Sequence, residues 1–238
     1  GGEQLTPLFA DPGVSVNEIP AGTPGTTVTT TVILSNNGST TTTFTTTVVI
    51  NGATTTLVNT LAPNTTESVV ISVPLTATGA TVTATITDSS VPDSNLGNNS
   101  DSENAGALFA DVTTEVDLPA NAPAGTVVTG TVVFTNSAAA GATASAVVGT
   151  VTLSNGESYT YSVGDLTPGA SATRTFTTTV PSTLGTVLEV TSTVATATPE
   201  SNTANNTDVD NQAGGEQLTP LFADPGVSVN EIPAGTPG

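Results

Sequence analysis

Hydrophobic and polar residues alternate along much of the chain with a period of two residues. The clearest pair of segments places four residues each on one face: Val28, Thr30, Val32 and Leu34, then Val128, Gly130, Val132 and Phe134. Successive side chains of a β-strand point to opposite faces, so this period predicts strands with one buried face. We expect further strands near residues 14–18, 43–50, 53–60, 66–73, 80–88 and 99–105, and no helix.

Turn residues separate these segments. Asn51-Gly52 stands between two runs rich in Thr and Val, which is a strong local signal for a β-hairpin, and Asn155-Gly156 marks the same corner in the second half. Pro and Gly cluster at 20–25 and 119–125. About seven short strands, with turns every ~8–12 residues, predict an antiparallel sandwich of two sheets.

The chain carries a long internal repeat. Residues 1–25 and 214–238 have the same sequence, at a spacing of 214 − 1 = 213 residues. Leu-Phe-Ala-Asp begins at Leu8, Leu108 and Leu221, with spacings of 100 and 113 residues that sum to the same period. A long period is typical of arrays in which each unit is one structural block. We therefore expect one full period of a tandem array followed by the opening of the next.

Each period contains two related domains. Leu61-Ala-Pro-Asn64 corresponds to Leu166-Thr-Pro-Gly169, and Val73-Pro74 corresponds to Val180-Pro181. Asn tolerates the left-handed backbone that Gly provides, so we expect the same turn at Asn64 and Gly169. The predicted organisation is a linker at 1–7, a first sandwich at 8–107, a second sandwich at 108–213 and the start of the next repeat at 214–238.

Composition favours a folded β protein. Hydrophobic residues make up 36% of the chain, which is more than disordered chains usually contain, and Thr and Val share the branched Cβ that favours strands. A continuous amyloid-like stack is the alternative β architecture, because Thr-Val runs of low charge suit a steric zipper. Pro residues and paired hairpin turns recur in register with the domain boundaries, and this favours closed domains.

Charge and residue types exclude several classes of function. The chain has 20 acidic residues, a single basic residue (Arg174) and a net charge of −19. Nucleic acid and anionic membranes bind through clustered Lys and Arg, so we expect neither as a partner. No apolar stretch approaches the ~20 residues of a membrane-spanning helix. The absence of Cys excludes a disulfide framework.

Catalysis is not expected. The chain has no His, Cys or Lys, and its Ser and Thr hydroxyls have only carboxylates as candidate bases. A carboxylate pair could hydrolyse a glycoside, but no acidic residue stands within an apolar stretch. We predict that the chain is not an enzyme, and we assign no catalytic, cofactor-binding or metal-binding residue.

Calcium is the one cofactor that the sequence leaves open. Oxygen-bearing residues gather twice, shortly before each domain ends: Asp93, Asn95, Asn98, Asn99 and Asp101, then Glu200, Asn202, Asn205, Asn206, Asp208 and Asp210. Carboxylate and amide oxygens suit Ca²⁺, although the spacing does not match an EF-hand loop. Asn and Asp also form ordinary turns by bonding to nearby backbone, and this interpretation is favoured.

Leu-Phe pairs open each domain, at Leu8-Phe9, Leu108-Phe109 and Leu221-Phe222. The favoured interpretation makes them the first core residues of their domains. In the alternative, Phe wedges between successive domains and stiffens the junction. Only Ala105-Gly-Ala107 precedes Leu108, whereas the second junction is longer, so we expect a tight joint to alternate with a looser one.

The residues resemble a known group of surface domains. Val163-Gly-Asp-Leu-Thr-Pro-Gly-Ala-Ser171 and Pro199-Glu-Ser-Asn-Thr-Ala-Asn-Asn-Thr207 are similar to the Thr-rich repeat domain of bacterial and archaeal surface proteins. The first domain also resembles the cell-adhesion-related domain of bacteria, through its Leu-x-Pro turn and terminal Asn-Asn. The resemblance covers nearly the whole chain and implies exported, tandem immunoglobulin-like β-sandwiches.

These observations predict a structural role outside the cell or at its surface. We expect the repeating segment of a long filament or adhesin stalk, with copies of itself as partners. One alternative is an adhesive module that recognises a glycan or a partner surface, with Ca²⁺ as a possible cofactor. Another is a homopolymer in which separate protomers donate a strand to one another. Tyr159 and Tyr161, the only tyrosines, alternate along one strand and are expected to pack rather than bind.

Overall fold

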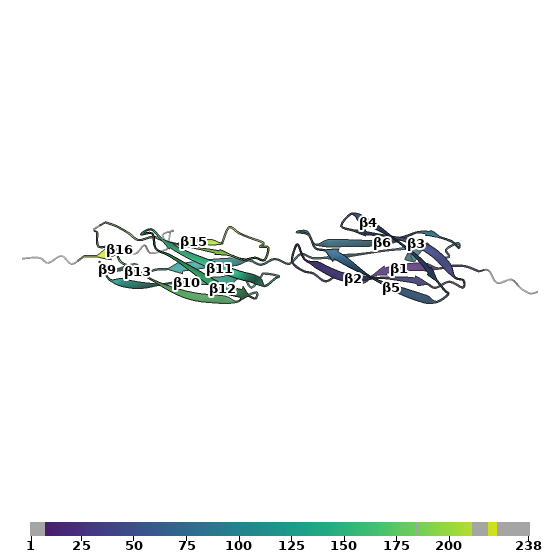
Figure 1. Ribbon diagram of the computed structural model, residues 1–238, viewed down its shortest axis with the longest axis horizontal. Helices are drawn as coiled ribbons and strands as arrows, with labels where there is room; N and C mark the ends of the chain where they lie inside the picture. Colours follow the sequence, from purple (N-terminus) through teal and green to yellow (C-terminus); the bar gives the residue numbers. More distant parts are fainter. Residues whose placement is uncertain (1–7, 184, 211–218, 223–238) are drawn as a thin grey trace, which may run out of the picture.

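The computed structural model describes residues 8–183, 185–210 and 219–222. These residues form two antiparallel β-sandwiches that follow one another along the long axis (Figure 1). We call the sandwich of residues 10–105 domain 1 and that of residues 110–210 domain 2. The described residues contain no α-helix, and their one helical segment is a 3-10 turn, η1 (Leu96–Asn98). The predicted all-β sandwich fold is therefore confirmed.

Domain 1 packs a three-stranded sheet against a four-stranded sheet. The strand orders are β1-β2-β5 and β4-β3-β6-β7, and all neighbours run antiparallel. All six predicted strand ranges lie within two residues of an observed strand. The strands are β1 (Pro12–Val16), β2 (Thr27–Asn36), β3 (Thr42–Ile50), β4 (Ala53–Leu61), β5 (Thr65–Pro74), β6 (Ala80–Ser89) and β7 (Ser100–Ala105).

Domain 2 repeats this topology. Its sheets have the orders β13-β10-β8 and β12-β11-β14-β15, which match those of domain 1 strand for strand. A short parallel pair, β9 with β16, lies apart from them. The strands are β8 (Val112–Asp117), β9 (Asn121–Pro123), β10 (Val127–Asn136), β11 (Ala144–Leu153), β12 (Ser158–Leu166), β13 (Ser171–Thr179), β14 (Val190–Ala195), β15 (Thr207–Val209) and β16 (Thr219–Leu221).

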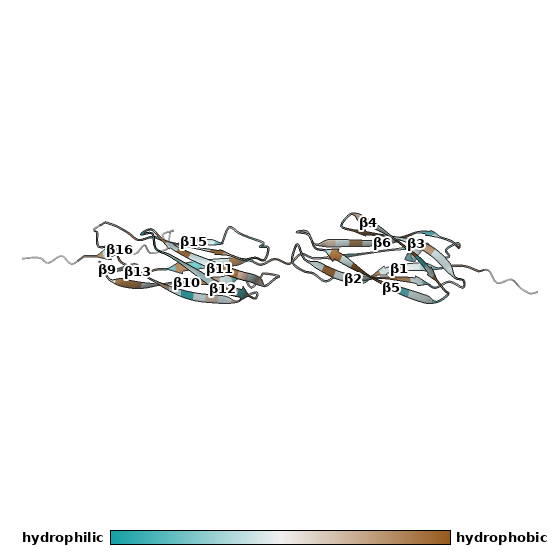
Figure 2. Cartoon of the chain, viewed as in Figure 1, coloured by the Kyte–Doolittle hydropathy of each residue, from teal (hydrophilic) through white to brown (hydrophobic). Residues whose placement is uncertain are grey.

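Each sandwich encloses its own hydrophobic core. Alternate residues of the central strands point inward, so hydrophobic and polar colours alternate along the arrows in Figure 2. Phe44, Leu34 and Val48 are fully buried in domain 1, and Phe134 and Val151 in domain 2. The two clusters share no residue, so each domain buries apolar surface independently of its neighbour.

Three turns show how the local sequence directs the chain. Asn51 and Gly52 both have positive φ, at 49° and 86°, and Ile50 faces Ala53, which is the two-residue hairpin that Asn-Gly predicts. Asn64 has φ of 56° where Gly169 has 80°, so the predicted exchange of Gly for Asn is confirmed. The Asn155-Gly156 corner is longer, because Leu153 donates its N–H to the carbonyl of Glu157.

One predicted correspondence between the domains is wrong. Leu75 donates its N–H to the Thr26 carbonyl, and Val180 donates in the same way to Thr126. Leu75 therefore corresponds to Val180, and the match of Val73-Pro74 to Val180-Pro181 is out of register by two residues. A shift of two keeps every side chain on its face, so alternation alone could not reveal the error.

No helix among the described residues is both long and apolar enough to cross a membrane.

Candidate functional site: the carboxylate–amide clusters and the junction

The first group of candidate calcium residues lies around η1, against the start of domain 1. Asn98 Nδ2 donates to Asp11 Oδ1 over 2.9 Å, and Asn99 Nδ2 donates to Asp93 Oδ2 over 2.8 Å. Asp101 Oδ2 accepts the Val16 N–H over 2.7 Å. The remaining member, Asn95, caps η1 by accepting the N–H of Gly97.

Domain 2 repeats the same bonds with its own residues. Asn205 Nδ2 donates to Asp111 Oδ1 over 2.9 Å, and Asn206 Nδ2 donates to Glu200 Oε1 over 3.0 Å. Asp208 Oδ2 accepts the Val116 N–H over 2.7 Å, as Asp101 accepts that of Val16. Asn202 Oδ1 accepts the Ala204 N–H, as Asn95 accepts that of Gly97, and Asp210 Oδ2 adds a bond from the Leu118 N–H.

These bonds join the first strand of each domain to its last. β1 and β8 are edge strands, and their outward N–H groups at Val16 and Val116 are capped by carboxylates of the opposite sheet. Hydrogen bonds to ionised groups are stronger than neutral ones. The clusters therefore close one long side of each sandwich, which is a structural use of the candidate residues.

Four amide oxygens of the clusters have no hydrogen-bond partner within the structure: Oδ1 of Asn98, Asn99, Asn205 and Asn206 are all buried. Their amide N–H groups face carboxylates, and this fixes the side-chain orientation. Within the described ranges, no three carboxylates gather in an arrangement that could hold a metal ion. A cation would therefore depend on amide oxygens.

A buried Asn organises the start of each domain and was not predicted. Asn36 is fully buried; its Oδ1 accepts the N–H groups of Asp11 and Gly38, and its Nδ2 donates to the carbonyls of Leu61 and Thr40. Asn136 does the same with Asp111, Leu166 and Ala142. The signal was present in the sequence, because Asn ends both aligned strands.

The junction between the domains is bonded on both sides. Gly22 donates its N–H to the Gly106 carbonyl over 3.4 Å and accepts the Leu108 N–H over 2.9 Å, which ties the connection to domain 1. The next residue belongs to domain 2, since the Phe109 carbonyl accepts the N–H groups of Gly141 and Ala142. No residue between these anchors is free of both domains.

The Leu-Phe pairs are not core residues. The core of each domain begins one residue later, at Ala10 and Ala110, which are fully buried. Leu8 and Phe9 are 71% and 42% exposed, and Leu221 and Phe222 are 52% and 40% exposed. Leu108 and Phe109, which have a domain on each side, are half-buried. The interpretation as first core residues is wrong, and the pair with a described domain on each side is less exposed than the other two pairs.

The second junction begins like the first. β16 pairs in parallel with β9, and Pro220 faces Ala122 in the register that Ala107 takes with Gly22. The structure does not describe residues 211–218, so the predicted looser joint and the predicted start of the next repeat at 214–238 lie largely outside the described residues.

Both tyrosines lie on β12 and reach across to the other sheet. Tyr161 OH donates to the Thr175 carbonyl over 2.9 Å, and Tyr159 OH donates to the Thr177 carbonyl. Their rings pack against Phe134 and Phe176. Burial raises the pKa of Tyr161 above its usual value near 10; Tyr159 adds to the rise and Arg174 opposes it. The tyrosines therefore close a sandwich edge.

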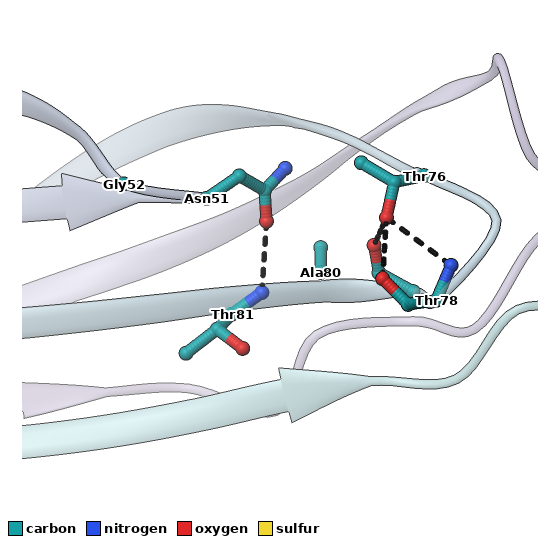
Figure 3. A pocket seen from close by; sticks show the side chains of 7 residues that line it. Asn51, Gly52, Thr76, Thr78, Ala80 and Thr81 are labelled. Atoms are coloured by element: carbon teal, nitrogen blue, oxygen red, sulfur yellow. Dashed lines mark hydrogen bonds between the residues drawn. The ribbon is translucent and has the colours of Figure 1, made fainter.

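A hollow of about 400 Å³ lies beside the junction in domain 1 (Figure 3). Asn51 Oδ1 accepts the Thr81 N–H on one side, and Thr76 Oγ1 donates to the Gly79 carbonyl on the other. All seven residues that line it are uncharged and none titrates near neutral pH. The hollow offers hydroxyl and amide groups but no general acid or base.

Comparison with known proteins yields no family. No family model matches the chain, and no curated protein matches it. Among solved structures, the CARDB domain of the PF1109 protein from Pyrococcus furiosus, in complex with di-metal ions, is 19% identical, covers 43% of this chain and 97% of its own, and has a TM-score of 0.39. The solution NMR structure of the same domain is 18% identical, covers 48% of this chain and 97% of its own, and also has a TM-score of 0.39.

Red sea bream transglutaminase covers 92% of this chain at 13% identity, with a TM-score of 0.35, and the match spans 32% of the enzyme. At these identities the likeness is one of fold alone, since many unrelated activities share the sandwich architecture.

Proposed function

We propose that the chain is the structural repeat of a long extracellular filament or adhesin stalk, with no catalytic activity and with copies of itself as partners. The observation that carries this proposal is the junction. The connection at 106–110 is hydrogen-bonded to both domains, and β16 begins the next connection in the same register. The same connection therefore recurs at the end of each domain, and this suits domains joined end to end.

Exposure of the Leu-Phe pairs supports the same proposal. Leu108 packs close to Gly141 of domain 2, while its N–H is bonded to Gly22 of domain 1. Leu221 already has the neighbour in the preceding domain, through its pairing with β9, and no residue that the structure describes takes the place of Gly141 beside it. A following copy of domain 1 would cover Leu221 and Phe222 with the surface that lies beside Leu8 and Phe9.

The charge of the chain fits an extracellular filament. A net charge of −19 keeps the polymer in solution and opposes unspecific aggregation, because like charges repel over a Debye length of roughly 8–10 Å. The scarcity of Lys and Arg leaves few cleavage sites for trypsin-like proteases. Both properties suit a long polymer outside a cell.

The direct test is a chain of two complete periods. We expect its hydrodynamic length to grow in proportion to the number of domains, and Phe222 of the first period to become as protected as Phe109. A two-period chain with independent, freely tumbling halves would refute the serial junction. Electron microscopy of the native polymer would then give the axial repeat.

Strand donation is the second candidate. β1 is an edge strand of domain 1, and residues 223–238 have the same sequence as residues 10–25, which include β1. An acceptor that lacks its own first strand could bind this segment from a neighbour. The mass of the native polymer on a denaturing gel separates the two forms: a single band of hundreds of kilodaltons indicates a continuous chain, and a band near one period indicates donated protomers.

A calcium-dependent adhesive module is the remaining candidate. The four unpartnered Asn oxygens favour it, because amide oxygens are hard ligands that suit Ca²⁺. The bonds already made by the carboxylates favour a purely structural cluster. Thermal unfolding with Ca²⁺ and with a chelator decides between them: a midpoint that rises with Ca²⁺ supports binding, and equal midpoints remove this candidate.

A further inference from the structure

One edge of domain 1 is open where the matching edge of domain 2 is closed. β5 and β13 are the outer strands of the three-stranded sheets, and each has one neighbour. Asn64 and Leu75 donate their N–H groups to the carbonyls of Asn36 and Thr26. The even-numbered residues of β2 therefore direct their backbone N–H and C=O groups toward β5. By the register of this pair, Ser68, Val70 and Ser72 direct their N–H and C=O groups outward.

In domain 2 the corresponding carbonyls are occupied. The outward residues of β13 are Thr173, Thr175 and Thr177, by the same argument from register. Arg174 Nη1 donates to the first carbonyl over 2.9 Å, and Tyr161 and Tyr159 donate to the second and third. A strand arriving at β13 would have to displace all three side chains.

In domain 1 the side chains that could cap β5 are missing. Val48 of β3 and Val151 of β11 occupy equivalent buried positions, two residues before the end of each strand. Val48 pairs with Thr55 and Val151 pairs with Tyr159, so Thr55 takes the place of Tyr159 in domain 1. By the same alignment, Leu57 takes the place of Tyr161. Neither replacement can reach β5 with a hydroxyl donor, and no described residue caps the carbonyls of Ser68, Val70 or Ser72.

The open edge is also uncharged. From Thr66 to Ser72, the side chains on the solvent face of β5 are exposed and are all Ser, Thr or Val, and Val70 is 70% exposed. The one charge of the strand, Glu67, is held by Asn59 Nδ2 over 2.9 Å. Natural edge strands are usually protected by charges, bulges or cover, and an unprotected one is a template for pairing. On a chain of net charge −19, an edge without free charges lets like molecules approach each other with little local repulsion.

We infer that β5 pairs with β5 of a second copy of this chain, antiparallel and centred on Val70, so that two neighbouring filaments associate side by side. The strand can pair with a copy of itself, because Ser68-Val-Val-Ile-Ser72 has Ser at both ends and aliphatic residues between them in either chain direction. Val70 would face Val70 of the other copy, and Ser68 would face Ser72. Each facing pair would exchange both backbone hydrogen bonds, which is an isologous contact.

The pairing ends where the edge is blocked. Pro74 has no N–H, and its carbonyl already accepts Asn51 Nδ2 over 2.7 Å. A contact this short is weak for a single pair of chains. If the chain is a repeat, as proposed above, the edge recurs once per period, and many weak contacts in line give a tight association.

The test uses the whole chain and a matched pair of variants. Val70→Lys and Thr175→Lys both add one positive charge at corresponding positions, and each changes the net charge from −19 to −18. Reduced net charge by itself would strengthen self-association. Two lysines facing each other across the contact, with the Val pair lost, should raise the dimer dissociation constant about tenfold. Thr175→Lys should not.

Sedimentation velocity over a concentration series measures the association, and hydrogen exchange locates it. We expect the amides of Ser68, Val70 and Ser72 to become protected as concentration rises, while those of Thr173, Thr175 and Thr177 do not change. A chain that stays monomeric at millimolar concentration, an equal response of both variants, or unchanged exchange at β5 would each overturn the inference. These results bear on side-by-side contact and leave the end-to-end junction untouched, so the two proposals fail separately.

Discussion

The two domains share one topology and fill it with different side chains. In domain 2, the ring of Phe134 lies over Gly149, where an added Cβ would come within 2.0 Å of it. In domain 1 the same positions hold Leu34 and Thr46. A second pair repeats the exchange, since Phe176 lies over Gly130 and Ile71 lies opposite Thr30. Each large residue is matched by a small one, so the core volume is kept.

The exchange of core residues has consequences at the surface. The aromatic rings of domain 2 support Tyr159 and Tyr161, which close the edge of the sandwich. Domain 1 has Thr at the position of each core Gly, has no Tyr, and its edge stays open. One of its buried hydroxyls, Thr46 Oγ1, has no partner. The comparison teaches that core packing and edge protection are coupled through the same residues.

The largest effect is expected where the domains are alike. Asn36→Ala and Asn136→Ala remove the buried amides that bond to backbone groups on both sides of each sandwich. Since several buried partners lose their bonds, we expect each to cost about 3 kcal/mol of unfolding free energy. Denaturant unfolding with domain-resolved hydrogen exchange measures both. Unequal losses would show that the two Asn residues have different roles.

Gly149→Ala should destabilise domain 2 and leave the stability of domain 1 unchanged. The new methyl group would overlap the ring of Phe134, so we expect a loss of about 2 kcal/mol in the stability of domain 2. Thr46→Ala makes the opposite change at the corresponding position of domain 1, because it removes atoms and creates no overlap with a ring. Combining Gly149→Ala with Phe134→Leu should recover part of the loss. Failure of this rescue would contradict the matched-volume interpretation.

Thr46→Val should stabilise domain 1. Val has the shape of Thr without the unpaired hydroxyl, and burying that hydroxyl is unfavourable. We expect a gain of about 1 kcal/mol, measured as a higher denaturant midpoint for domain 1 with domain 2 unchanged. A lower midpoint would mean that a bound water satisfies Thr46.

Alkaline pH should affect domain 2 selectively. The folded-state pKa of Tyr161 is raised by burial, so its contribution is fully present below the unfolded value near 10 and is lost as the pH rises through the folded value. Domain 1 contains no tyrosine. We expect a small drop in the midpoint of domain 2 as the pH rises above about 10. Tyr161→Phe should abolish that drop, and an equal drop in both domains would contradict the assignment.

Much of the fold was predictable because its signals are local. Alternation placed the strands of domain 1, and Asn51-Gly52 specified a hairpin whose two positive φ angles only a few residue types adopt. Register between strands was harder. The pairing of Leu75 with Thr26 cannot be told from a shift by two residues, because both keep the same face buried.

The functional features were less predictable, because they depend on contacts between distant segments. The Asn and Asp residues of the clusters were identified by their density, but their partners lie at the first strands of the domains, 85 to 92 residues away in the sequence. The buried amide of Asn36 looked like any Asn at a strand end. The Leu-Phe pairs looked like core residues, since hydrophobicity alone does not say which domain covers them.

The backbone bonds of Gly22 to the connecting segment have a mechanical consequence for the proposed filament. A joint fixed by peptide hydrogen bonds resists rotation about the fibre axis as well as bending, so the angle between successive domains is set by the chain. Every period would then inherit the same angular offset. The β5 edges of successive periods would then lie on a regular helix around the fibre axis. The pitch of that helix would set the length over which two fibres could stay in contact.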